Sequence, residues 1–183
     1  HPPQHCVVVQ RDRHRCDVVP GRDHDWADLV ARAKHDGVAA DCVPMAATDP
    51  LYILYTSGTT GNPKGVMLTH RNLVANVAQF SSIQGITADD VVIAVLPFFH
   101  IYGMTVLLNA ALRARARLVI MPSFDLQKFL TNIENHRCTV GYIAPPVAVA
   151  LAKHPVIDQF DLSSLKVVMS GAAPLDEDLG HAV

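Results

Sequence analysis

The chain has 183 residues, a formal net charge of −2 at pH 7, and a composition that is 50% hydrophobic and 17% charged. A chain of this length can build one well-formed core, and its apolar share is richer than that of an average soluble domain. The near balance of scattered charges argues against nucleic acid as a partner.

The first half of the chain predicts two helices and a strand. One helix follows Asp25, which can act as its N-cap, and Gly37 can end it. Residues 51–56 are apolar, aromatic and β-branched, which is typical of a strand. A longer helix follows Thr69 and ends before Gly85. The apolar residues at helical spacing are Trp26, Leu29, Val30 and Ala33 in the first helix, and Leu73, Val74, Val77 and Phe80 in the second.

The second half alternates short apolar strands with helices. Strands are predicted at residues 91–95, 117–121, 140–143 and 166–169, and helices at residues 102–114, after the cap Asp125, and at residues 145–154. The inward residues of the middle helix are Leu126, Phe129, Leu130 and Ile133. Repeated strand-helix-strand units predict an α/β fold with a mainly parallel sheet and flanking helices, which binds ligands beyond the carboxyl ends of its strands.

A loop rich in glycine and hydroxyl groups follows the first predicted strand. Residues 56–66 read Thr-Ser-Gly-Thr-Thr-Gly-Asn-Pro-Lys-Gly-Val, with four hydroxyls, three glycines and one cation. Glycines let backbone N–H groups approach an anion, hydroxyls add donors, and Lys64 adds charge, so the pattern suits a polyphosphate. Lys64 follows Pro63 and precedes Gly65, which excludes a Walker A loop. A plain surface loop is the alternative interpretation.

Two further motifs come directly after predicted strands. Residues 97–103 read Pro-Phe-Phe-His-Ile-Tyr-Gly, and residues 170–175 read Ser-Gly-Ala-Ala-Pro-Leu. A histidine among aromatic residues is either a satisfied core residue or a functional one. Small residues after a strand indicate a tight strand-to-helix turn, a reading that is compatible with a place at a binding site. The residues alone are compatible with a structural role and with a functional role for each motif.

The loop at residues 56–65 resembles the signature loop of adenylate-forming enzymes, which include acyl- and aryl-CoA synthetases, luciferases and peptide-synthetase adenylation domains. Residues 144–146, 151–155 and 160–166 are similar to the 4-coumarate:CoA ligase group within that family. The resemblance is close over residues 49–183 and loose over residues 1–48. It implies a partial N-terminal, AMP-binding domain over residues 1–183, with residues 1–48 as a lead-in and the C-terminal domain absent.

The resemblance also implies which residues bind ligands. The residues expected to bind ATP are Thr56, Ser57, Gly58, Thr59, Thr60, Gly61, Lys64 and Gly65. Thr60 is in addition a possible contact to Mg²⁺ through the phosphates. The residues expected to bind the carboxylic acid substrate are His100, Tyr102, Gly103, Gly171 and Ala172.

The implied function is that of an ATP-dependent carboxylic acid:CoA ligase, which forms acyl-AMP and then acyl-CoA from an aryl acid such as 4-coumarate or from a fatty acid. The alternatives are an adenylation domain that loads a carrier protein and a non-catalytic nucleotide-binding module. Ser123 stands where related plant ligases commonly carry a basic residue implicated in CoA binding. The family's Tyr-Gly-x-Thr-Glu and Thr-Gly-Asp motifs do not occur in these residues. We therefore assign no catalytic residue and expect the chain alone to be inactive.

Other features bear on location and association. No apolar run approaches the roughly 20 residues of a membrane span, and no signal peptide is recognisable. The four cysteines include no Cys-x-x-Cys pair, so we expect reduced thiols in a cytoplasmic protein. His5, Cys6, His14 and Cys16 match no zinc spacing. The chain lacks an initial Met, which suggests an internal piece whose exposed core faces would self-associate; a processed start is the alternative.

Overall fold

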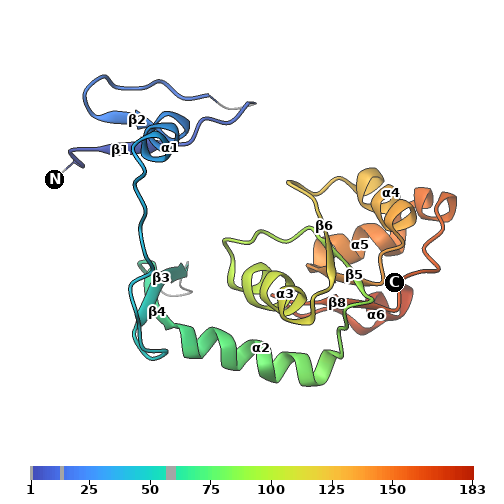
Figure 1. Cartoon of the computed structure of the whole chain (residues 1–183). Helices are drawn as coiled ribbons and strands as arrows, with labels where there is room; N and C mark the ends of the chain where they lie inside the picture. Colours follow the sequence, from blue (N-terminus) through green and yellow to red (C-terminus); the bar gives the residue numbers. More distant parts are fainter. Residues whose placement is uncertain (1, 13–14, 57–60) are drawn as a thin grey trace. The chain divides into compact units, whose positions relative to one another are not determined.

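The computed structural model of the chain describes residues 2–12, 15–56 and 61–183 (Figure 1). It divides into two compact units, His1–Met45 and Ala46–Val183. Ser57, Gly58, Thr59 and Thr60, four of the residues expected to bind ATP, lie outside the described residues. No helix in these three ranges combines the length and the apolar character that crossing a bilayer would need.

The first unit is a small strand pair with one helix. Strand β1 (Cys6–Val8) pairs in parallel with β2 (Asp23–Asp25), and helix α1 (Trp26–His35) follows. The side chain of Asp25 accepts hydrogen bonds from the backbone N–H groups of Ala27 and Asp28, so the predicted N-cap is confirmed. The two strands were not predicted, because three-residue strands are too short to show an alternating pattern.

The second unit begins with a β-hairpin. Strand β3 (Pro50–Thr56) pairs antiparallel with β4 (Lys64–Thr69), and Thr56 lies opposite Lys64. The strand predicted at residues 51–56 is confirmed. The prediction of a continuous loop from residue 56 to residue 66 is wrong at its end, because residues 64–66 belong to β4 and pair with β3. The hairpin forms its own two-stranded sheet, so this loop does not follow a strand of the parallel sheet.

Helix α2 (His70–Gln84) confirms the second predicted helix. The Thr69 hydroxyl accepts a hydrogen bond from the Asn72 backbone, and the Asn72 side chain accepts one from the Thr69 backbone, which together form a capping box. Gly85 ends the helix in the left-handed conformation, with φ of 63°. Of the four apolar residues at helical spacing in this helix, only Val77 is buried.

The main sheet has four parallel strands in the order β6-β5-β7-β8. Their bounds are Val91–Ala94 for β5, Arg117–Ile120 for β6, Val140–Ile143 for β7 and Val167–Ser170 for β8. All four predicted strands are confirmed, and so is the α/β fold class. The two central strands are buried along their whole length, which explains why they read as continuous apolar runs.

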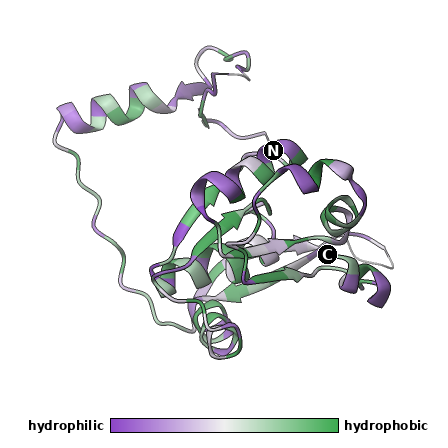
Figure 2. Cartoon of the chain, turned by 90° about the vertical axis from the view of Figure 1, so that its right-hand side faces the viewer, coloured by the Kyte–Doolittle hydropathy of each residue, from purple (hydrophilic) through white to green (hydrophobic). Residues whose placement is uncertain are grey.

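Helices cover both faces of this sheet. One face carries α4 (Leu126–His136), α5 (Pro145–Lys153), a 3₁₀-helix (Pro155–Gln159) and α6 (Glu177–Ala182), and the other carries a π-helix (Tyr102–Asn109), α3 (Ala110–Ala114) and part of α2. In Figure 1, β5, β6 and β8 lie between α3 and the pair α4 and α5. Figure 2 shows the hydrophobic strands, in green, between helices that are partly purple.

Side chains of the two central strands contribute to two separate hydrophobic cores, one on each face of the sheet. In β5, Ile93 packs with Phe129 and Ile133 of α4, whereas Val92 faces the core that contains Leu107. Successive strand residues point to opposite faces, so one buried strand supplies both cores. The remaining predicted helices, at residues 126 onward and 145–154, are confirmed within one or two residues.

The segment predicted as a helix at residues 102–114 begins as a π-helix and continues as α3. A side chain on Gly103 would place its Cβ atom 2.1 Å from the Pro97 carbonyl oxygen, so only glycine allows this close approach. The Thr105 hydroxyl donates to the Ile101 carbonyl at 2.7 Å. Over two turns, an apolar pattern cannot distinguish the wider π-helix from an α-helix. Such π segments frequently occur at functional sites.

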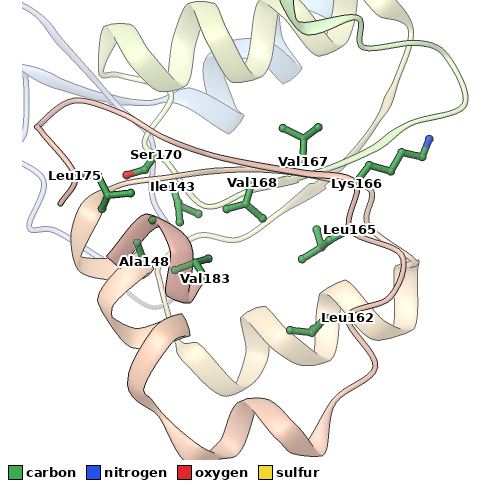
Figure 3. A pocket seen from close by; sticks show the side chains of 11 residues that line it. Ile143, Ala148, Leu162, Leu165, Lys166, Val167, Val168, Ser170, Leu175 and Val183 are labelled. Atoms are coloured by element: carbon green, nitrogen blue, oxygen red, sulfur yellow. The ribbon is translucent and has the colours of Figure 1, made fainter. Parts of the chain in front are cut away.

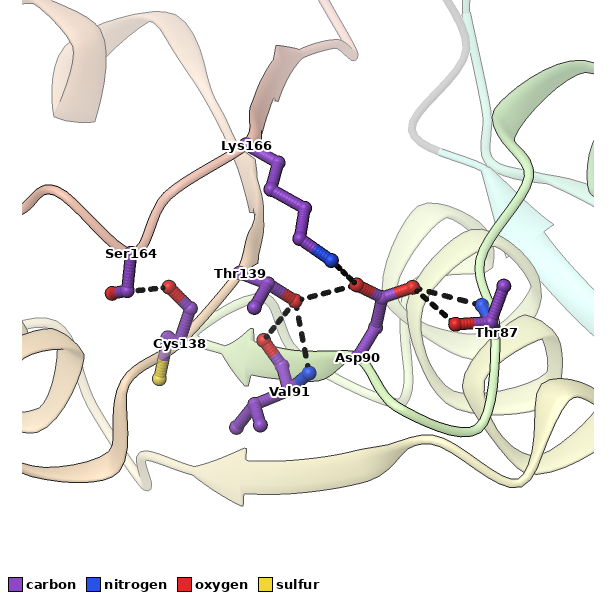
Figure 4. Close-up of polar contacts among 7 residues, drawn as sticks. All are labelled: Thr87, Asp90, Val91, Cys138, Thr139, Ser164 and Lys166. Carbon is purple, nitrogen blue, oxygen red and sulfur yellow. Dashed lines mark hydrogen bonds and ion pairs between the residues drawn. The ribbon is translucent and has the colours of Figure 1, made fainter.

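A buried carboxylate ties together the amino ends of three strands (Figure 4). Asp90 is 5% exposed and accepts hydrogen bonds from the Thr87 backbone and hydroxyl, the Thr139 hydroxyl at 2.8 Å and the Lys166 ammonium at 3.0 Å. The Thr139 hydroxyl also accepts from the Val91 backbone. Burial acts to raise the pKa of Asp90, but these hydrogen bonds outweigh it and hold the pKa well below its usual range. Sequence reasoning did not identify this network.

Candidate functional site

The loops after β5 and β8 meet at the carboxyl edge of the sheet. Tyr102, which follows β5, donates its hydroxyl hydrogen bond to the Met169 carbonyl of β8 at 3.2 Å. A Cβ atom on Gly171 would lie 2.9 Å from the ring of Tyr102, so the ring rests directly on this glycine. Burial raises the pKa of the Tyr102 phenol, which therefore stays a neutral donor at physiological pH. The two motifs singled out in the sequence are thus neighbours in space.

His100 is held in a defined orientation. The Tyr102 backbone N–H donates to Nδ1 of His100 at 3.2 Å, and the His100 backbone N–H donates to the Pro97 carbonyl. An Nδ1 atom that accepts a hydrogen bond carries no proton, so in the neutral ring the proton sits on Nε2. His100 can therefore offer an N–H donor to an oxygen atom of a ligand.

These residues border an open hollow of about 700 Å³, which we call the acid hollow. Four parts of the second unit line it: strand β4, helix α2, the π-helix and the loops at the carboxyl edge of the sheet. Its walls include Val66 and Leu68 from β4, Asn72 and Asn76 from α2, Tyr102 at the start of the π-helix, and His100 and Ala172 from the edge loops. The hairpin and the two loop motifs therefore border the same space.

Gly103 and Gly171 do not line the acid hollow but support it from behind. Gly103 lets the π-helix approach Pro97, and Gly171 leaves room for the Tyr102 ring. Ala172 has φ of 71°, a left-handed conformation that costs a non-glycine residue energy, and it lines the hollow. Of the five residues expected to bind the acid, three are at the surface of the hollow and two shape it.

The described ends of the signature loop are exposed at the hairpin. Thr56 ends β3, Lys64 begins β4, and within the described ranges Lys64 forms no ion pair. Gly61 has φ of 140°, which favours glycine. A Cβ atom on Gly65 would lie 2.8 Å from Cγ2 of Ile53, so the strand pairing itself requires this glycine. Thr60, the possible contact to Mg²⁺, lies outside the described residues, as do Ser57, Gly58 and Thr59.

Sequence reasoning missed several residues of the acid hollow. Asn72 and Asn76 lie four positions apart on α2, and Thr105 and Val106 belong to the π-helix. The signal for the asparagines was present, because polar residues at helical spacing interrupt the apolar residues of α2. In the described part of the chain, no group of three or more His, Cys, Asp or Glu side chains is placed to hold a metal ion.

A second hollow of about 430 Å³ lies beside the edge strand β8 (Figure 3). Its lining is mostly apolar, and Ile143 and Val168 point into it. The Lys166 side chain borders it, but its ammonium group turns away to Asp90. The Ser170 hydroxyl is buried and has no hydrogen-bond partner among the described residues. None of the predicted site residues lines this hollow, and it offers little chemistry.

Comparisons with known proteins identify the family of the chain. A family model described as AMP-binding enzyme matches residues 2–183. Two ligases from Solanum tuberosum, 4-coumarate-CoA ligase 1 and 4-coumarate-CoA ligase 2, are 43% and 47% identical over 91% and 86% of this chain. The crystal structure of ATP-bound MatB from Rhodopseudomonas palustris is 35% identical and superposes with a TM-score of 0.71 over 79% of this chain.

The chain spans 31% and 29% of the lengths of these two ligases, and 28% of the MatB chain. The family match nevertheless covers nearly every residue, and the solved structure shares the arrangement of the strands and helices. The chain therefore belongs to the AMP-binding enzyme family.

Proposed function

We propose that this chain is the phosphate- and acid-binding part of an ATP-dependent carboxylic acid:CoA ligase. In the proposed reaction a carboxylate attacks the α-phosphorus of ATP to give acyl-AMP and pyrophosphate, and the CoA thiol then displaces AMP to give the thioester. The observation that carries the proposal is the acid hollow, where the hairpin strand β4 and the loops bearing His100 and Ala172 border one space. The two Solanum tuberosum ligases support this reaction class, and the ATP-bound MatB supports the use of ATP.

The first step brings two anions together, so the site has to neutralise phosphate charge. Lys64 suits this task, because it is exposed beside the signature turn. The proposed phosphate ligands are Lys64, the hydroxyls of Thr56, Ser57, Thr59 and Thr60, and the backbone N–H groups of Gly58, Gly61 and Gly65. Mg²⁺, when bound with ATP, would supply further positive charge near Thr60.

The acid hollow suits a carboxylate with an apolar or aromatic body. Val66, Leu68 and Val106 provide apolar surface, and the Tyr102 ring provides an aromatic wall. The Nε2 proton of His100 can donate to the carboxylate or to the acyl oxygen. An aryl acid such as 4-coumarate fits this description, and a fatty acid is the second candidate. CoA as the acceptor is part of the same proposal, although Ser123 offers no positive charge to it.

The cysteines support a reducing, cytoplasmic setting for this reaction. Cys6, Cys16, Cys42 and Cys138 are all free thiols in the structure. Burial raises the pKa of the Cys138 thiol to about 11, so this side chain stays protonated and behaves as a small apolar residue. Thiols kept in this state are typical of intracellular proteins.

Calorimetric titration of the chain with ATP and Mg²⁺ tests the proposal. We expect weak but measurable binding, and we expect the Lys64→Gln variant to bind about tenfold more weakly, because a charge-assisted donor is lost. The Lys128→Gln variant removes an exposed lysine from α4, on the other side of the sheet, and serves as the matched control. Equal affinity in both variants would contradict the role of Lys64.

A second measurement addresses catalysis. Because the chain lacks the family's adenine and ribose motifs, we expect no pyrophosphate exchange that depends on a carboxylic acid. Robust exchange by the purified chain would show that the catalytic groups have been assigned incorrectly.

A further inference from the structure

A third hollow lies along helix α2, outside the site described above. It has a volume of about 370 Å³ and is bordered by β3, by α2 and by the segment formed by the π-helix and α3. We call it the α2 groove, and its lining consists of Leu51, His70, Leu73, Val74, Val77, Asn109 and Arg113. Leu73 is the only described residue that also borders the acid hollow.

The groove exists because the two facing helical surfaces do not match. On α2, Leu73, Val74 and Val77 belong to the apolar residues that repeat at helical spacing in the sequence. Val77 is indeed only 5% exposed, but Val74 is 60% exposed. The opposite segment presents Asn109 and Arg113, four positions apart and therefore on one helical face. The hollow between them therefore has one apolar wall and one polar wall.

The polar wall carries a positive charge, on Arg113, without a counter-charge. His70 lines the groove from α2, and none of the described residues that line the groove is acidic. Neither side chain takes part in the side-chain hydrogen bonds or ion pairs found in residues 2–12, 15–56 and 61–183. The guanidinium of Arg113 is permanently charged and can bind a carboxylate through two parallel hydrogen bonds.

We propose that the α2 groove binds a small organic monocarboxylate with an apolar body. The head group pairs with Arg113, next to the Asn109 amide, and the body covers Leu73, Val74 and Val77. The volume lies at the lower end of the range for small-molecule pockets, which suits a molecule of the size of 3-phenylpropionate. A polyphosphate is a poor fit, because four of the seven described lining residues are apolar and only one of them is an arginine. The inference does not rest on the ligase reaction.

The test is an NMR titration of the isotope-labelled chain with 3-phenylpropionate and, separately, with its neutral counterpart 3-phenylpropanamide. We expect 3-phenylpropionate to shift the backbone amide signals of Val74, Val77 and Arg113. We expect the propanamide, which lacks the charge, to bind about tenfold more weakly or not at all. Equal binding of the two compounds would overturn the assignment to carboxylates.

Two arginine variants locate the head group. Arg113→Gln should weaken 3-phenylpropionate binding at the groove by about tenfold or more, whereas Arg115→Gln, an exposed arginine outside the groove, should bind like the wild type. If Arg113→Gln binds as tightly as the wild type, the proposal is wrong. Val74→Asp provides a second variant in case Arg113→Gln fails to fold. Val74 is largely exposed, so the aspartate leaves the core intact and should repel the carboxylate.

The same spectra separate the groove from the other candidate occupants. Shifts confined to residues around His100 and Ala172 would place the compound in the acid hollow alone and would overturn this inference while leaving the proposed function intact. Broadening of the Val74 and Val77 signals with rising protein concentration, in the absence of any compound, would show that a second copy of the chain covers the groove. That result would also overturn the inference.

Discussion

The two edges of the parallel sheet differ in the way their polar groups are satisfied. At the amino edge, Asp90 is buried and its carboxylate accepts hydrogen bonds from Thr87, Thr139 and Lys166. At the carboxyl edge, His100 lines an open hollow, its Nδ1 accepts a hydrogen bond from the Tyr102 backbone, and its Nε2 has no hydrogen-bond partner among the described residues. One edge uses polar groups to hold strands together, and the other leaves them free to bind a ligand.

This difference predicts which substitutions should affect stability and which should affect binding. Changes at the amino edge remove satisfied hydrogen bonds from a buried site, so their cost appears in the free energy of unfolding. Changes to exposed residues at the carboxyl edge leave the cores untouched, so their cost should appear in ligand affinity.

Asp90→Ala should have the largest effect. We expect a loss of roughly 3 kcal/mol in the free energy of unfolding, because the part-buried Thr139 hydroxyl and the Thr87 backbone lose their acceptor. Urea denaturation measures the loss. Asp89→Ala changes the exposed neighbour and should stay within about 0.5 kcal/mol of the wild type. Similar losses in both variants would contradict a special role for the amino-edge network.

The pH dependence of stability should report the same network. The pKa of Asp90 is lower in the folded chain than its ordinary value of 3.8. Its ionised form therefore stabilises the fold above that ordinary value, and the stabilisation is lost as the pH falls toward the folded pKa. The difference in unfolding free energy between wild type and Asp90→Asn should be constant from pH 7 to pH 5 and should shrink below pH 4. A difference that does not change with acid would contradict the lowered pKa.

Gly171→Ala should affect both stability and binding, because this residue lies behind the wall of the acid hollow. The added methyl group would meet the Tyr102 ring at 2.9 Å, so the ring has to move. We expect a loss of about 1 kcal/mol in stability, by overpacking, and several-fold weaker binding of 4-coumarate in an NMR titration. Gly180→Ala is the matched control, because its nearest contact would be an ordinary 3.8 Å. If the Gly171→Ala variant bound 4-coumarate as tightly as the wild type, the Tyr102 ring would not be part of the acid-binding site.

His100→Ala should have the smallest effect on the fold. The side chain is exposed, so we expect a change in stability of less than about 0.5 kcal/mol. The loss of one neutral donor should weaken acid binding by about three- to tenfold. His136→Ala, at the exposed end of α4, should leave the affinity unchanged. A loss of stability without a loss of affinity would assign His100 to the fold rather than to the site.

Much of the fold follows from local patterns that the sequence carries. The caps Asp25, Thr69 and Asp125 each start a helix where they were predicted to, because their side-chain oxygens accept hydrogen bonds from the first turn. The four strands of the parallel sheet appear as short apolar runs, since burial on both faces demands apolar residues at every position. The order of residues in the signature loop is specific enough to indicate the family by itself.

Other features of the fold depend on contacts between residues that are far apart in the sequence. Strand β4 exists because β3 pairs with it, and the exposed Lys64 and Gly65 carry no strand pattern of their own. The π-helix depends on the contact between Gly103 and Pro97, and the network at Asp90 joins residues that are 49 and 76 positions apart. Local sequence determines which turns and strands can form, because caps and periodicity act over a few residues. The hairpin, the acid hollow and the amino-edge network instead depend on packing between distant segments, which no short stretch of sequence can specify.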